Sequence, residues 1–159
     1  MQTPQFEIES QMLIRVAVGR AFEAFINPEL TTRFWFTKSS GKLIPGAIVT
    51  WYWEMFNLST KVRVLEIIDN KTLMIEWGEP AAKVIWEFES RGVDQTLVKI
   101  KTYAEGKGDV LIATAVDLKG GFTMVLAGAK ALLEQGVELN LIQDQFPDGP
   151  PCGELNVTD

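Results

Sequence analysis

The feature that most constrains the fold is a series of short segments in which apolar and polar residues alternate. These segments are 6–18, 46–55, 60–68, 72–77, 83–90 and 96–103, and most of them are separated by turns containing Pro, Gly or Asn. Alternation with a period of two is typical of strands with one buried face, and short turns favour antiparallel neighbours. The sequence therefore predicts an antiparallel sheet with one apolar and one charged face.

Two stretches break this alternation with a helical period. Residues 19–30 carry apolar residues at helical spacing, and Pro28 interrupts them, with Asn27 as a suitable N-cap for a second short helix. Residues 109–135 form a long apolar-faced pattern that ends at Gly136, a natural C-cap. The expected buried face of this helix contains Ile112, Ala115, Phe122, Val125, Leu126, Ala129 and Leu133.

The long helix is the only predicted element that could cover the apolar face of the sheet. The pair Gly120–Gly121 inside it predicts either a kink or a close approach to another element, because glycine disfavours a helix interior. Residues 138–159 are rich in Pro, Gly and acidic side chains, and we expect them to be extended.

Several tryptophans lie on the same face of the predicted strands. In the segment "TWYWEM", Trp51 and Trp53 face one way and Tyr52 and Glu54 face the other. The same phase places Trp77, Trp86 and Phe88 on the helix side, whereas Glu76 and Glu87 face outward. Two interpretations stay open: the rings line a pocket for a flat apolar ligand, or they fill a core in which nothing binds.

The segments "AFEAFINPELTTRFW", "PGAIVTWYWE", "TKVRVLEIIDNKTLMIEW" and "GGFTMVLAGAKALLEQG" together resemble the START-like (Bet v 1-like) superfamily, in the branch named after the activator of the Hsp90 ATPase. The resemblance implies an α+β helix-grip fold: a curved antiparallel sheet of about seven strands around a long C-terminal helix, with two short helices after the first strand. It also implies a cavity between sheet and helix. Residues 1–137 would form this domain, and residues 138–159 an acidic C-terminal tail.

Composition excludes several functions. The chain has 159 residues and no histidine, which removes the commonest general base and a His-ligated metal site, so we predict no catalytic residues, metal or cofactor. All 15 Lys and Arg lie within residues 1–130, and six acidic residues follow Lys130. A neutral body with an acidic end is a poor partner for nucleic acid.

We expect no apolar run to reach the ~20 residues of a membrane span. One cysteine, Cys152, and the lack of a signal peptide fit the cytoplasm.

The candidate ligand-binding residues are the inward aromatics. We expect the entrance at the short helices, where Leu30, Phe34 and Trp35 lie, and Arg33 could meet a ligand carboxylate unless it forms a surface ion pair. Glu66 is the one strand carboxylate in phase with inward residues, although a change of phase is expected beside it. The predicted ligand-binding set is Phe25, Trp35, Trp51, Trp53, Trp77, Trp86, Phe88 and Phe122.

The function that these features favour is a non-enzymatic module that encloses an apolar small molecule, lipid-like or aromatic. The alternatives are a chaperone-associated interaction protein, as the resemblance implies, and a cyclase that works by desolvation with Tyr or Glu as acid. A homodimer and a chaperone partner stay open, because no motif in the chain specifies either surface.

Overall fold

The computed structural model describes residues 5–150, so Cys152 and the acidic residues Glu154 and Asp159 of the predicted tail lie outside the described residues. Its strands form one sheet in the order β1-β7-β6-β5-β4-β3-β2, and all neighbours are antiparallel. The two-residue strand β2 is too short to show a pattern in the sequence. The strands are β1 (Gln5–Ile14), β2 (Lys38–Ser39), β3 (Ile48–Trp53), β4 (Leu58–Ile68), β5 (Thr72–Trp77), β6 (Ala82–Ser90) and β7 (Thr96–Glu105).

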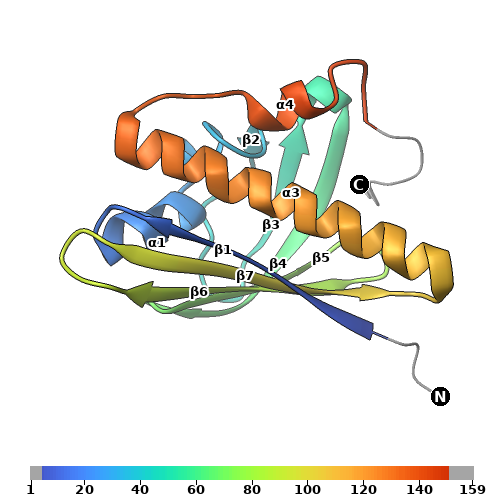
Figure 1. The fold of residues 1–159 in the computed structure, drawn as a ribbon, viewed down its shortest axis with the longest axis horizontal. Coiled ribbons are helices and arrows are strands. Elements are labelled where there is room, and N and C mark those ends of the chain that lie inside the picture. The colour runs from blue at the N-terminus through green and yellow to red at the C-terminus, as the bar shows by residue number, and fades with distance from the viewer. Residues whose placement is uncertain (1–4, 151–159) are drawn as a thin grey trace.

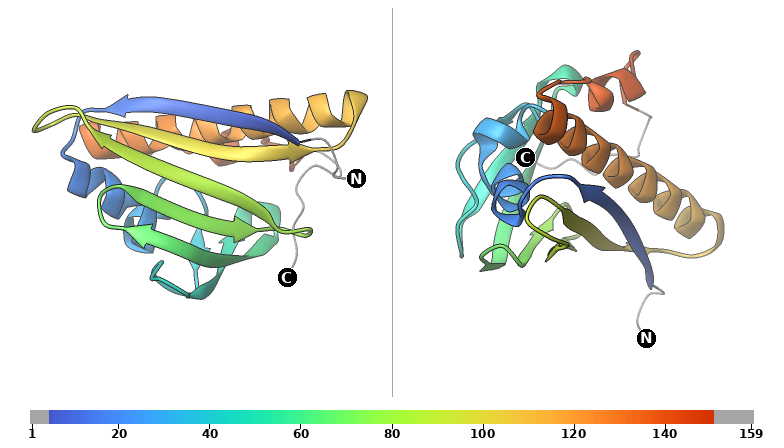
Figure 2. Two further views of the ribbon diagram at one scale, coloured as in Figure 1. Left: turned by 90° about the horizontal axis from the view of Figure 1, so that it is seen from below. Right: turned by 60° about the vertical axis from the view of Figure 1, so that its left-hand side comes forward.

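One long helix, α3 (Gly108–Gln135), lies across the concave face of the curved sheet (Figures 1 and 2). The predicted fold class is therefore confirmed. The predicted caps are also present: the side chain of Asn27 accepts a hydrogen bond from the Glu29 N–H at 3.1 Å, and Gly136 ends α3 with φ 68°. The shorter helical elements are α1 (Val18–Ile26), α2 (Pro28–Thr31), the 3-10 turn η1 (Glu54–Phe56) and α4 (Leu141–Gln145).

One expectation about local structure is corrected here and another is confirmed. Residues 141–145 form α4, and Ile142 packs against the core, so the prediction of an extended segment after Gly136 is wrong there. In β4 the register shifts between Val64 and Glu66, as the expected phase change required. Glu66 is exposed after that shift, so it does not face the space between sheet and helix.

The two halves of α3 differ in burial. All seven of its buried residues lie at or after Phe122, whereas Val110, Ile112 and Val116 are 66%, 62% and 64% exposed. The prediction that Ile112 is buried is wrong, because only the C-terminal half of the helix packs fully onto the sheet. By length and composition alone, α3 is long and apolar enough to cross a membrane, a property that core helices of globular proteins also have. We call residues 108–121 the N-terminal half of α3.

Polar contacts fix the C-terminal half of α3 to the end of β1. Lys130 Nζ donates to the Leu13 carbonyl at 2.8 Å, and the Arg15 N–H donates to Glu134 Oε2 at 2.7 Å. Burial raises the pKa of the Glu134 carboxyl, but the hydrogen bonds from Lys130 and Arg15 outweigh it, so that this pKa lies below its ordinary value. These bonds hold the helix end in one position on the sheet.

Glycine permits a close approach in α3 at a position that sequence reasoning did not single out. A Cβ at Gly128 would lie 3.2 Å from both the Cβ and the carbonyl oxygen of Phe34, but at Gly120 and Gly121 it would meet nothing within 4 Å. Among the described residues, no other element therefore packs closely against the Gly120–Gly121 pair. Instead it lies where the packed half of α3 begins.

This contrast predicts opposite effects of two alanine substitutions. Gly120→Ala should raise the free energy of unfolding by about 1 kcal/mol, because alanine favours a helix interior and nothing obstructs its methyl group. Gly128→Ala should lower it by about 1–3 kcal/mol, because Phe34 is held by its own packing and cannot move away. Urea unfolding of both variants measures the difference. Equal stabilisation by the two substitutions would contradict the described contact between α3 and Phe34.

Candidate functional site

Nine aromatic rings between the sheet and α3 form what we call the aromatic cluster, and Phe22 and Phe34 extend it through contacts with Phe88 and Phe25. Trp35 lies at its centre, with its ring centroid 4.9 Å from that of Trp51 and 6.1 Å from that of Phe122 on α3. Most contacts are edge-to-face or tilted, which aromatic rings prefer because of their quadrupoles. The members are Phe25, Trp35, Phe36, Trp51, Trp53, Trp77, Trp86, Phe88 and Phe122.

The strand register brings these rings together. Trp51, Trp77 and Trp86 occupy inward positions of β3, β5 and β6, and Trp77 and Trp86 both contact Phe122, at 6.0 and 6.4 Å between centroids. Trp53 contacts Trp51 and Trp77 at 6.5 and 6.3 Å. The prediction that these four tryptophans face the helix is therefore confirmed. Their role as ligand-binding residues stays a prediction.

Burial divides the cluster into a closed and an open end. Trp51 and Trp86 are 1% and 0% exposed, whereas Trp53 and Trp77 are only half-buried. Trp35, expected at an entrance, lies at the centre of the cluster and is 6% exposed. The open end of the cluster is therefore at Trp53 and Trp77, away from the short helices.

Sequence reasoning missed one member of the cluster. Phe36 stacks on Trp51, with centroids 4.4 Å apart and planes 16° apart, and it is 2% exposed. The signal was present in the consecutive aromatics of "RFWF" at 33–36. Arg33, in the same stretch, pairs with Glu138 at 3.2 Å on the surface. Of the two expectations for Arg33, the surface ion pair is therefore the one found.

Two buried polar atoms on the inner side of the sheet have no hydrogen-bond partner among residues 5–150. They are Nε1 of Trp86 and Oγ1 of Thr60, which is paired with Trp51 across the β3–β4 ladder. A buried group left without a partner costs about 1–3 kcal/mol, so such atoms are rare in folded proteins. Thr102, buried to the same degree, differs: its hydroxyl donates to the Lys83 carbonyl at 2.8 Å.

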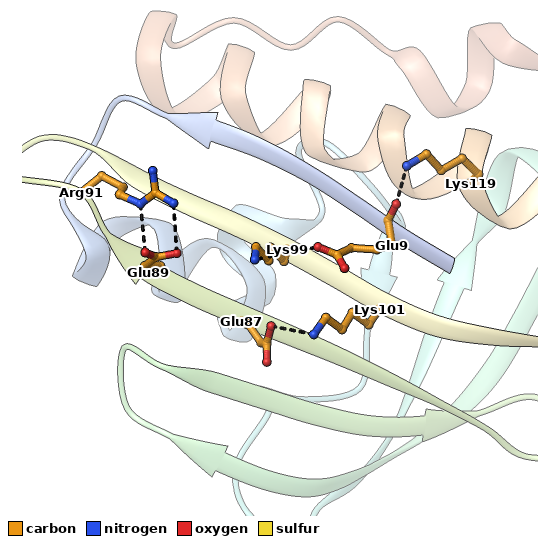
Figure 3. Close-up of polar contacts among 7 residues, drawn as sticks. All are labelled: Glu9, Glu87, Glu89, Arg91, Lys99, Lys101 and Lys119. Atoms are coloured by element: carbon orange, nitrogen blue, oxygen red, sulfur yellow. Dashed lines mark hydrogen bonds and ion pairs between the residues drawn. The ribbon is translucent and has the colours of Figure 1, made fainter. Parts of the chain in front are cut away.

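The outer face of the sheet is charged, and its side chains pair with one another (Figure 3). The hydrogen bond from Arg91 lowers the pKa of Glu89, and the one to Glu87 raises the pKa of Lys101. Within these pairs each cation is matched by a carboxylate. The pairs of this charged ladder are Lys101–Glu87 at 3.2 Å, Lys99–Glu9 at 3.9 Å and Arg91–Glu89 at 3.0 Å.

A hollow of about 620 Å³ lies beside this ladder, and Phe88 is the one member of the aromatic cluster in its lining. It is open to solvent, and most of the residues that line it are polar or charged. The aromatic cluster, by contrast, is filled by its own rings, and a ligand could enter only where they are half-buried. We therefore take the open end of the cluster as the candidate site. The hollow is lined by Val18, Asn70, Lys71, Thr72, Glu87, Phe88, Glu89, Ser90 and Lys99.

Comparison with known proteins agrees with this architecture. Residues 15–134 match the family described as Activator of Hsp90 ATPase homolog 1-like protein. No curated protein matches the chain. Among solved structures, the protein SSP2350 from Staphylococcus saprophyticus is similar, with 26% identity and a TM-score of 0.73, over 84% of this chain and 96% of that one.

Two further structures share the fold at lower identity. The Aha1 dimer from Colwellia psychrerythraea has a TM-score of 0.70 at 16% identity, over 82% of this chain and 98% of its own. Norcoclaurine synthase from Thalictrum flavum, solved as a point mutant with a transition-state analogue, has a TM-score of 0.62 at 14% identity, over 86% and 99%. One fold thus carries an enzyme in one of these proteins and a dimeric protein in the other.

The unpaired Thr60 hydroxyl generates a prediction about stability. Thr60→Val removes a buried polar atom without a partner, so the free energy of unfolding should rise, by up to about 1 kcal/mol. Thr102→Val is the matched control: it breaks the bond to Lys83 and should lower the free energy of unfolding by about 1 kcal/mol. Both values come from urea unfolding. If Thr60→Val destabilised the protein as much as Thr102→Val, the Thr60 hydroxyl would have a partner.

Proposed function

This chain belongs to the Activator of Hsp90 ATPase homolog 1-like family, and we propose that it binds an apolar, ring-containing small molecule at the open end of the aromatic cluster. The same fold holds a transition-state analogue in norcoclaurine synthase. The ligand would lie between Trp53, Trp77 and the N-terminal half of α3. This proposal treats residues 1–137 as the binding domain and residues 138–159 as an acidic tail, in a cytoplasmic protein.

One observation carries the proposal: apolar side chains on both sides of this end are left half-buried. Trp53 and Trp77 on the sheet, and Leu118 on α3, pack against the core without being fully covered. No residue of α3 before Phe122 is buried. Large, rigid aromatic rings facing an incompletely covered helix are the kind of wall that binds a flat apolar molecule.

The ligand needs a route into the cluster, and α3 supplies one. Gly120 and Gly121 separate its packed half from its exposed half, and two adjacent glycines lower the cost of bending a helix there. Phe122, the next residue, contacts both Trp77 and Trp86. A small movement of the N-terminal half would therefore uncover Trp77 and the edge of Phe122, and a rotation of the Phe122 side chain would then open the cluster inward.

The same site argues for binding rather than turnover. The Trp, Phe and Leu side chains of the site transfer no protons, and two carboxylates of the neighbouring strands face outward, where Glu76 pairs with Arg63 at 3.6 Å and Glu87 pairs with Lys101. General acid–base catalysis needs a group within hydrogen-bond reach of the substrate. The function that the site supports best is thus a non-enzymatic binding module.

A substitution that fills the site tests this proposal. The aromatic hydrocarbon 2-isopropenylnaphthalene should raise the melting temperature of the parent protein and shift the indole N–H resonances of Trp53 and Trp77. Leu118→Trp should weaken its binding at least tenfold, because the larger ring occupies the ligand's place. Val116→Trp is the matched control, since Val116 is 64% exposed on the opposite side of the helix, and it should bind as the parent does. No response from the parent protein, or equal binding by the two variants, would refute the proposal.

A second candidate function is stimulation of the ATPase of an Hsp90-type chaperone, as the family description suggests. The observation in its favour is the exposed apolar surface of Val110, Ile112 and Val116, which a protein partner could cover. If this holds, the protein should raise the ATPase rate of a purified Hsp90-type chaperone, and Ile112→Asp should abolish the effect without changing the binding of the hydrocarbon. An unchanged ATPase rate with the parent protein would remove this candidate.

A further inference from the structure

We propose that the ligand carries a neutral hydrogen-bond acceptor, such as a ketone or quinone oxygen on an aromatic ring system, and that the Trp86 Nε1–H donates to it. This inference rests on the proposed binding function and narrows the ligand class. It would make Trp86 the residue that orients the ligand, whereas the other rings supply apolar contact.

The reason is the position of the Trp86 indole. Trp86 is 0% exposed, and its Nε1 atom has no hydrogen-bond partner among the described residues. Its ring lies among those of Phe25, Trp35 and Phe122, at 6.1, 6.0 and 6.4 Å between centroids. Leaving a donor unpaired in such surroundings is expensive, and an indole donor is usually bonded when it is buried.

The surrounding protein has no suitable acceptor to offer. Across the ladders, Trp86 is opposite Leu73 on β5 and Ile100 on β7, and both side chains are apolar. The backbone carbonyls of a central strand are engaged in the sheet. Ring faces can accept only a weak N–H···π contact. A strong partner for this N–H must therefore come from a molecule that enters the cluster.

The donor lies within reach of the candidate site. Phe122 is in contact with both Trp77, at the open end, and Trp86, at the closed end. A molecule of two fused rings that lies against Trp77 and displaces Phe122 would therefore meet the Trp86 indole at its far edge.

The acceptor should be neutral. The side chains in ring contact with Trp86 are Phe25, Trp35 and Phe122. Because no Lys or Arg among residues 5–150 is buried, no cation lies in the core with the indole to pair with a carboxylate or phosphate. Burying an unpaired charge among aromatic rings is far more costly than burying a carbonyl group that receives one hydrogen bond. This excludes fatty-acid carboxylates in the deep part of the cluster and favours ketones, quinones and esters.

Two probes of the same shape test the inference. 2-Acetylnaphthalene and 2-isopropenylnaphthalene differ only in a carbonyl oxygen in place of a methylene group. The parent protein should bind the ketone roughly tenfold more tightly than the hydrocarbon, because only the ketone pairs the buried N–H. In a ¹⁵N spectrum the indole N–H resonance of Trp86 should move downfield with the ketone and not with the hydrocarbon.

Variants assign the preference to one atom. In Trp86→Phe the ratio of the affinities for the ketone and the hydrocarbon should fall to about one. The smaller ring affects the binding of both probes, so this effect cancels in the ratio. In Thr60→Val, which removes the other unpaired buried polar atom, the preference should persist. The indole spectrum of the parent protein decides the case should Trp86→Phe fail to fold.

Each other outcome has a distinct meaning. Equal affinity for the two probes would overturn the inference and leave the proposed function standing. The affinities would be equal if a water molecule, rather than the ligand, accepted the hydrogen bond of the indole. A preference that Trp86→Phe keeps and Thr60→Val loses would overturn it too, in favour of Thr60. If neither probe binds, the proposed function itself fails.

Discussion

The packing around Trp35 is the interaction on which the rest of the structure depends. Its ring contacts tryptophans of β3, β5 and β6 and also Phe122 of α3, so one side chain joins the sheet to the helix that covers it. Because the Trp35 N–H donates to the carbonyl of Thr31, the last residue of α2, the same contacts also fix the short helices against the sheet. Replacing such a ring by a small residue would leave a large cavity and cost about 3–5 kcal/mol.

This arrangement divides the molecule into a firm and a loose end. Beside α1 and the end of β1, α3 is held by seven buried residues and by the bonds of Lys130 and Glu134. Beyond the Gly120–Gly121 pair it keeps exposed apolar side chains and covers Trp53 and Trp77 incompletely. Local opening is cheapest where few contacts must be broken. The small-molecule binding that we propose and the alternative recognition of a partner protein would both use this loose end.

The sequence was sufficient for the fold and insufficient for the site. Period-two alternation placed Trp51, Trp77 and Trp86 correctly, because a sheet with one buried face allows a single phase. The two-residue strand β2 and the helix α4 were missed, since their stability comes from tertiary contacts that no local pattern records. The exposure of Ile112 depends on how far α3 extends over the sheet. Whether Nε1 of Trp86 finds a hydrogen-bond partner depends on which groups surround it in space. Neither is encoded by spacing along the chain.

If the interior beside Trp53, Trp77 and Leu118 admits an apolar ring system, intermolecular nuclear Overhauser effects should connect 2-isopropenylnaphthalene to these residues in solution. We expect contacts from the naphthalene protons to the indole protons of Trp53 and Trp77 and to the methyl groups of Leu118. Contacts to residues around the outer hollow, such as Val18, or none at all, would show that the aromatic cluster is a closed core.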